Sequence, residues 1–296
     1  MRFNKIVSLL VLCIIILSLI ASLYGVFSNQ GQGLYEFKSL QGDTVSIYGK
    51  GLYKNDSVSI VAQGKAQDIV TMLLAVPLLL ISLYLMRKGS LKGRLLLTGT
   101  LGYFLYTYIT YTFLWMYNSF FIVYVILMSA SFFAFTLSMM SIDIEKLSLS
   151  FNNKLPVKFI GGFQIFLAVA IGLLWLGKIV PSLINGTPPL GLEHYTTLVI
   201  QGMDLGFIVP TAFLSGVLLI KRNSYGYLLS SVIIFKVITM ATALTAMVIG
   251  QAKAGVPMSL IEIFIFPIFN VLAFYTAFLL LNNVNEKGYN EMGISP

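Results

Sequence analysis

Two charged side chains stand inside apolar runs, where charge is rare. Lys236 lies about 12 residues along the run that follows Ser224, roughly 18 Å into a bilayer core of about 30 Å. Asp204 lies on the preceding run, roughly 25 Å above the Lys221 end by the same rise per residue. A lysine at such depth costs about 2.5 to 3.5 kcal/mol if it faces lipid, so it should face the interior and find a partner. Asp204 and Lys236 can therefore meet.

Two further polar residues stand on the last apolar run. Glu262, in the first turns of that run, is at an outer depth similar to that of Asp204, and Asn270 lies deeper. One hypothesis is that Asp204, Lys236 and Glu262 line a polar pocket, open to the outside, for an ion, a proton or a small polar molecule. The alternatives are an ion pair that only fixes helix packing, and acids that sit in the headgroup region as helix-start residues favoured by the helix dipole.

The stretch from 204 to 236 has an earlier counterpart in the chain. The matching residues, in order, are Gln67, Asp68, Pro77, Arg87-Lys88, Ser90 and Gly93 in the first stretch and Gln201, Asp204, Pro210, Lys221-Arg222, Ser224 and Gly226 in the second. Their spacings differ by one to three residues, and Tyr103 falls where Lys236 falls. The copies are separated by four spans and would face the same way, as in a parallel four-plus-four repeat. The alternative is that membrane hairpins with basic turns and prolines simply look alike.

The first copy differs from the second in its polar residues. Asp68 lies about 19 residues from Arg87, so it is predicted to be a simple interfacial residue near the membrane edge. Tyr103, Tyr106 and Thr110 fall on one helical face by their spacing of three and four, and can present hydroxyls to an interior cavity. The alternative for this face is aromatic packing.

Composition defines the class of protein. Hydrophobic residues make up 57% of the 296 residues and charged residues 10%, whereas a soluble domain has about 45 to 50% and about 25%. The net charge of +8 comes from basic residues between apolar runs, which indicates membrane topology and argues against a nucleic-acid partner. Cys13 and His194 are the only residues of their kinds, so we expect no disulfide, no Cys/His metal site and no bis-histidine haem. No cofactor is predicted.

Eight apolar runs predict an all-α polytopic transmembrane bundle in contact with the lipid bilayer. They cover residues 6–27, 68–86, 95–117, 120–142, 159–180, 198–220, 227–249 and 258–281. For the first run the alternative is a signal peptide. The repeat divides the chain into four-span halves at residues 1–150 and 151–296. The basic residues gather in one set of alternate loops, which predicts a cell-membrane protein with both termini cytoplasmic.

Residues 28–67 form the one sizeable polar segment, which the topology places outside the cell. The alternating residues 44–48 predict a strand. Residues 57–61 can pair with it as a hairpin or can begin a long helix capped by Asp56 or Ser57, and we favour the helix. The segment is expected to form a small cap and not a separate domain.

Catalytic motifs are not found in the sequence. It contains no G-x-S-x-G, no H-E-x-x-H and no phosphate-binding loop. Asp143 and Glu145 are separated by one residue and do not share a helical face. No catalytic residue is predicted, and enzyme activity is not expected.

The stretches at residues 50–53, 56–59, 66–68, 89–94 and 101–106 resemble a family of uncharacterised bacterial multi-spanning membrane proteins. The resemblance implies the membrane class and no activity. The leading hypothesis is a small-solute or ion-coupled transporter whose site lies between the two halves. The alternative is a membrane sensor or accessory subunit with structural charges, and a membrane enzyme acting on lipid-like substrates lacks a catalytic set.

Overall fold

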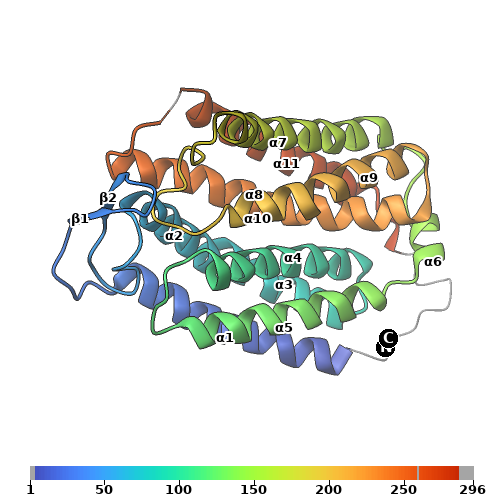
Figure 1. The fold of residues 1–296 in the computed structure, drawn as a ribbon. Coiled ribbons are helices and arrows are strands. Elements are labelled where there is room, and N and C mark those ends of the chain that lie inside the picture. Colours follow the sequence, from blue (N-terminus) through green and yellow to red (C-terminus); the bar gives the residue numbers. More distant parts are fainter. Residues whose placement is uncertain (1–3, 259, 287–296) are drawn as a thin grey trace.

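The computed structural model describes residues 4–258 and 260–286, except for the side chains of residues 261 and 262. Within these residues, long helices lie side by side in an elongated bundle with two short strands at one end (Figure 1). The elements up to residue 140 are α1 (Asn4–Phe27), β1 (Tyr35–Lys38), β2 (Thr44–Ile47), α2 (Val58–Val70), the π-helical turn η1 (Thr71–Ala75), α3 (Val76–Arg87), α4 (Leu91–Phe113) and α5 (Phe121–Met140). The later ones are α6 (Ile144–Leu149), α7 (Val157–Asn185), α8 (Val199–Met203), the π-helical turn η2 (Asp204–Ile208), α9 (Val209–Ile220), α10 (Ser224–Lys253) and α11 (Leu260–Asn282).

Seven helical segments of the described chain are long and apolar enough to cross a membrane. They include α2 to α3 as one continuous helix and α8 to α9 as another. The sequence predicted eight, and α4 is the helix that does not qualify. The difference has a physical reason, because α4 begins with Lys92 and Arg94 and carries many threonines and tyrosines. These side chains lie inside the protein, where α4 packs against α3, α5 and α10.

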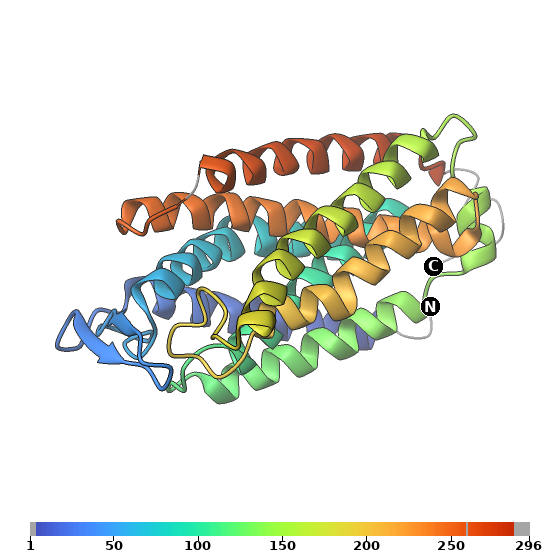
Figure 2. The same cartoon turned by 45° about the horizontal axis from the view of Figure 1, so that its top comes forward.

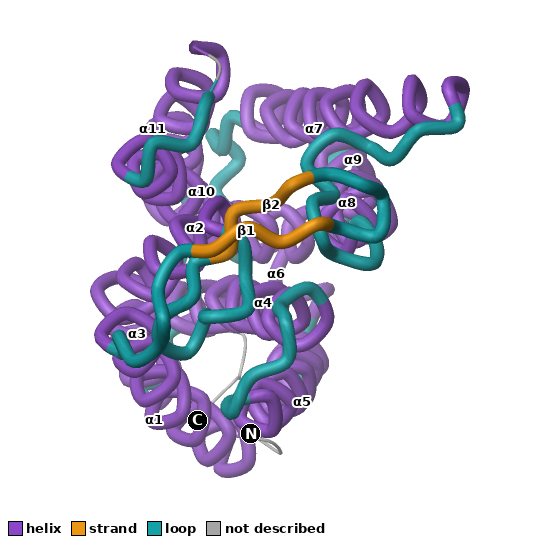
Figure 3. Tube along the Cα trace, turned by 60° about the vertical axis from the view of Figure 1, so that its left-hand side comes forward, coloured by secondary structure: helices purple, strands orange, loops and turns teal. Residues whose placement is uncertain are grey.

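The helices form two groups when the bundle is viewed from the strand end (Figure 3). One group contains α1, α3, α4 and α5, and the other contains α7, α9, α10 and α11. Helices α4 and α10 pack directly on each other across the middle. A side-chain carbon on Gly99 would clash with Phe235 of α10, so glycine is needed at this crossing. In Figure 2, α10 and α11 run nearly parallel, whereas α7 crosses the bundle obliquely.

The polar segment forms a small cap over one end of the bundle. Strands β1 and β2 pair antiparallel, with Tyr35 opposite Ile47 and Lys38 opposite Thr44. The predicted strand is confirmed, and its partner is the earlier stretch. The predicted helix start is also confirmed, because the Ser57 hydroxyl accepts a hydrogen bond from the Ile60 amide and α2 begins at the next residue.

The segments 71–93 and 204–226 are built alike. Each contains a π-helical turn followed by an α-helix whose second residue is proline, Pro77 in one and Pro210 in the other. Proline donates no backbone hydrogen bond and its ring crowds the carbonyl one turn earlier, so the wider π turn relieves that clash. Each segment then makes a reversal with a positive φ, at Gly89 and at Arg222.

The two segments correspond at one constant offset of 133 residues (210 − 77). The same offset relates η1 to η2, α3 to α9, and Tyr103 to Lys236. It pairs Asp204 with Thr71. The sequence comparison paired Asp204 with Asp68, and the geometry of the two π turns corrects that assignment by three residues.

Candidate functional site

Asp204 lies at the first position of η2 and is held by two neutral donors from other helices. The Tyr106 hydroxyl of α4 donates to Asp204 Oδ1 at 2.9 Å, and the Trp175 indole Nε1–H of α7 donates to Oδ2 at 2.9 Å. The residue is half-buried. An ionised carboxylate has about four acceptor positions, and these two bonds occupy two of them. Asp204 therefore keeps capacity for a further donor or a cation.

Lys236 lies behind the same tyrosine. Its ammonium nitrogen is 4.1 Å from the centre of the Tyr106 ring, and the residue is buried. The sequence allows a direct contact between Lys236 and Asp204. Both residues are described, and no ion pair joins them. Instead, the Lys236 ammonium lies over the face of the Tyr106 ring, and the Tyr106 hydroxyl donates to the Asp204 carboxylate. A cation–π contact of this kind contributes about 2 kcal/mol or more when it is desolvated.

The cluster of Asp204, Tyr106, Trp175 and Lys236 (the Asp204 cluster) draws on both helix groups. Tyr106 comes from α4, and the other three residues come from η2, α7 and α10. Sequence reasoning grouped Tyr106 with Thr110, and both side chains do reach the α8–η2 segment, since Thr110 contacts the Met203 sulfur. Trp175 was missed. Its rarity, as one of two tryptophans in the chain, was the available signal.

Asp68 has a different environment from the interfacial one that was predicted. It is buried in the described chain, with Oδ2 accepting from the Tyr53 hydroxyl at 2.6 Å and Oδ1 from the Tyr111 hydroxyl at 3.1 Å. Glycine at position 25 leaves room for this pair, because a side-chain carbon there would clash with both Asp68 and Tyr53. The correction arises because the cap and α4 fold over this end of α2. The site is closed, because the carboxylate is buried between Tyr53 of the cap and Tyr111 of α4.

The remaining candidate residues do not join the Asp204 cluster. Tyr103 is buried and shares a 2.8 Å hydrogen bond with Thr71, so it faces η1 and not η2. Asn270 accepts from the Thr242 hydroxyl at 3.2 Å between α10 and α11. The Glu262 side chain lies outside the described residues.

A second acidic group lies in the cap, where sequence reasoning named no site. Asp56 is buried, and its Oδ1 accepts from the Met116 backbone N–H at 3.0 Å and from the Tyr195 hydroxyl at 3.1 Å. It thereby ties the cap to the α4–α5 loop and to the α7–α8 loop. The pKa of Asp56 is raised to about 7, because burial and, to a smaller extent, nearby Glu193 outweigh the lowering effect of the two hydrogen bonds. Within the described chain, Asp56 Oδ2 and Glu193 Oε2 have no hydrogen-bond partner.

Two pockets open at the strand end of the bundle. One lies between α2 and α10, and the other lies between the hairpin, Glu193 and the residues after α10. Neither is lined by Asp204 or Lys236. Comparison with family models, with curated proteins and with solved structures gives no match for this chain. The functional argument therefore rests on the geometry of the Asp204 cluster.

Proposed function

We propose that this chain is a multi-pass protein of the cell membrane that carries a small polar solute, coupled to a proton or a small cation, through a site at Asp204. One observation carries the proposal. A half-buried carboxylate on an apolar helix accepts from two neutral donors, contributed by both helix groups, while Lys236 lies on the face of a tyrosine ring and forms no ion pair with the carboxylate. An acid placed only to neutralise Lys236 would pair with it directly.

The proposed topology has eight crossings, with α4 as the eighth, and cytoplasmic termini. α4 is 23 residues long and packs beside α3 and α5, which qualify as spans. A helix of this length covers about 34 Å, enough to cross a bilayer core. Its polar residues face protein, so they bear little of the cost that lipid exposure would impose.

We infer a parallel four-plus-four repeat from the matched π turns, prolines and reversals. The repeat is functionally asymmetric. The pair Thr71 and Tyr103 in the first copy is neutral and hydrogen-bonded, whereas Asp204 and Lys236 in the second copy are charged and separated by Tyr106. The first copy is then structural, and the second copy contains the site that binds and releases the ligand.

The π turn supports this role for Asp204. It interrupts the regular i to i−4 ladder, so the Val209 N–H bonds the Asp204 carbonyl one residue further away. Such turns are frequently found at functional sites. A cation that binds Asp204 would remove the charge to which the Tyr106 hydroxyl donates, and the change would reach Lys236 through the same ring.

The test uses purified protein and the variants D204N and D68N. Thermal unfolding midpoints are measured in sodium, potassium and choline salts at constant ionic strength and across pH. Wild type should be stabilised by one of these cations or, in a D56N background that removes the Asp56 contribution, by acid. D204N should lose that response, and D68N should keep it, because Asp68 is enclosed by the cap and α4. The proposal is wrong if D204N and wild type respond identically. Uptake of the stabilising cation into proteoliposomes then distinguishes transport from binding alone.

A second function, a membrane sensor or accessory subunit, is favoured by one observation. Both described pockets lie at the strand end, away from the Asp204 cluster, as docking surfaces would. In that case Asp204 and Lys236 are structural. The variant K236M would then lower the amount of folded protein, with no cation response in wild type to lose.

A further inference from the structure

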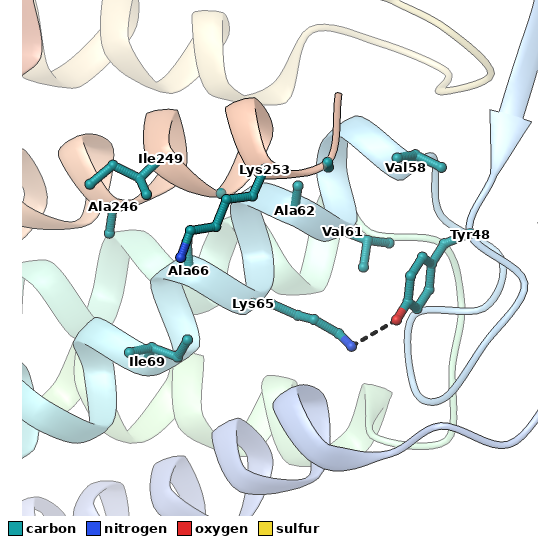
Figure 4. A pocket seen from close by; sticks show the side chains of 12 residues that line it. Tyr48, Val58, Val61, Ala62, Lys65, Ala66, Ile69, Ala246, Ile249 and Lys253 are labelled. Carbon is teal, nitrogen blue, oxygen red and sulfur yellow. Dashed lines mark hydrogen bonds between the residues drawn. The ribbon is translucent and has the colours of Figure 1, made fainter. Parts of the chain in front are cut away.

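Helices α2 and α10 cross closely near the cap and leave a groove beside the crossing. A side-chain carbon on Gly250 would lie 2.8 Å from the Ala62 carbonyl oxygen, so glycine allows the close approach. The groove has a volume of about 460 Å³ (Figure 4). Its lining residues are Tyr48, Val58, Val61, Ala62, Lys65, Ala66, Ile69, Ala246, Ile249, Gly250, Lys253 and Ala254.

The floor of the groove is apolar and faces the surroundings of the bundle. Ile69 is 41% exposed and Ile249 is 52% exposed. Between them the floor is made of alanine and glycine, which leave a shallow, smooth surface suited to a flexible hydrocarbon chain. Both helices qualify as membrane-spanning, so this floor lies against lipid.

Two lysines provide the polar part of the groove. Lys65 donates to the Tyr48 hydroxyl at 2.9 Å and lies 4.8 Å from the centre of that ring, so its position is fixed while two of its N–H donors stay available. Lys253 ends α10, and its side chain runs back along the groove toward Ala66 (Figure 4). The twelve lining residues, all of them described, include no carboxylate. The groove therefore carries two positive charges and no negative one in its lining, and the electrostatic partner of Lys65 is Asp68, which is buried behind the groove.

The depth of these groups matches the layers of a bilayer. From Val58 to Ile69 the α2 backbone rises about 17 Å, which reaches from the headgroup region into the hydrocarbon. The lysines stand above Ile69 and Ala246, on the cap side. A free phosphate would use the cations and leave the apolar floor bare, whereas a neutral lipid would use the floor and leave the cations unpaired.

We propose that the groove between α2 and α10 binds one anionic phospholipid from the leaflet on the cap side, with its phosphate at Lys65 and Lys253 and an acyl chain along Ala246 and Ile69. Charge complementarity and the order of polar and apolar residues along the groove select this occupant. The proposal does not depend on transport at Asp204.

The test is native mass spectrometry of the detergent-purified chain with phosphatidylglycerol and, separately, phosphatidylcholine of identical acyl chains. Wild type should retain one phosphatidylglycerol in preference to phosphatidylcholine. The double variant K65M/K253M should bind it about thirty-fold more weakly, as expected for the loss of two charges near a membrane surface. The double variant K38M/K54M, which removes two cap lysines outside the groove, should bind as wild type does.

The apolar floor is tested with I69S/I249S, which leaves both charges in place. It should weaken phosphatidylglycerol binding, and soluble glycerol phosphate should not compete in wild type. Helical circular dichroism and a single elution peak verify that each variant is folded. The proposal is overturned if both lipids bind equally, if K65M/K253M is unchanged, if glycerol phosphate displaces the lipid, or if a second copy of the chain occupies the groove and excludes lipid.

Discussion

Replacing Asp56 by asparagine should reduce the pH dependence of stability between about pH 4 and pH 7. The amide keeps one oxygen to accept from the Met116 N–H and the Tyr195 hydroxyl, as the carboxylate does. It differs by having no charge to bury. The groups that face Asp56 are Tyr195, Glu193 and, from α5, Tyr124, and none supplies a positive charge.

The direction in which pH changes the stability follows from proton binding. The folded protein holds the Asp56 proton up to about pH 7, whereas the unfolded chain releases it near the ordinary value of 3.8. Between these values the folded state binds more protons, so stability decreases as pH rises and levels off above about pH 7. A difference of about three pKa units corresponds to an upper value of about 4 kcal/mol. Burial also raises the pKa of Glu193, which adds to the effect in the same direction.

The assay is thermal unfolding of detergent-purified protein, followed by circular dichroism from pH 4.5 to pH 8. The wild-type midpoint should fall with rising pH, and the D56N midpoint should fall less steeply and exceed wild type at pH 8. The variant D43N removes an exposed carboxylate of the hairpin connection and serves as the matched control, with a wild-type profile expected. The reasoning is refuted if D56N keeps the wild-type slope, or if wild type becomes more stable as pH rises through this window.

Three further predictions concern packing and hydrogen bonds. Gly161→Ala places a carbon 2.6 Å from an α9 carbonyl oxygen, so it should lower the free energy of unfolding in chemical denaturation by about 1 to 3 kcal/mol. Gly162→Ala is the control, because its added carbon meets open space, and it should leave the denaturation midpoint unchanged or slightly higher. Tyr53→Phe removes one donor from buried Asp68 and should cost about 2 kcal/mol in the same measurement; an unchanged midpoint would contradict the closed site. Glu286→Gln weakens the acceptors for the first amides of α4, so hydrogen exchange at residues 91 and 92 should become about fivefold faster, for a loss of about 1 kcal/mol.

Local patterns predicted the elements well. Hydropathy gave most of the long helices, and the capping preference of serine gave the start of α2 at Ser57. Helix α4, which the sequence predicted as an eighth span, shows the limit of such reasoning. Its polar side chains lower its hydropathy, and they hydrogen-bond within α4 or to neighbouring helices, contacts that a one-dimensional profile does not contain.

The site was only partly predictable for a related reason. Asp204 and Lys236 stand out as charges in apolar runs, so rarity alone identified them. Tyr106 separates them because its side chain reaches from α4 to both η2 and α10, and residue spacing along one helix does not predict which side chain of another helix lies between two residues. The burial of Asp68 depends on Tyr53, which comes from the cap, and no local signal links the two.

The π turns also set the angular phase of the helices that contain them. Each holds one residue more than an α-helical turn, so the segment before it is rotated by about 100° from where a continuous α-helix would place it. The sides of α8 and α9 that face neighbouring helices therefore do not line up as one continuous stripe along the helix axis. Deleting Leu205 would restore the regular winding and swing Asp204 away from Tyr106 and Trp175. The one extra residue in η2 therefore determines the direction in which the Asp204 carboxylate points.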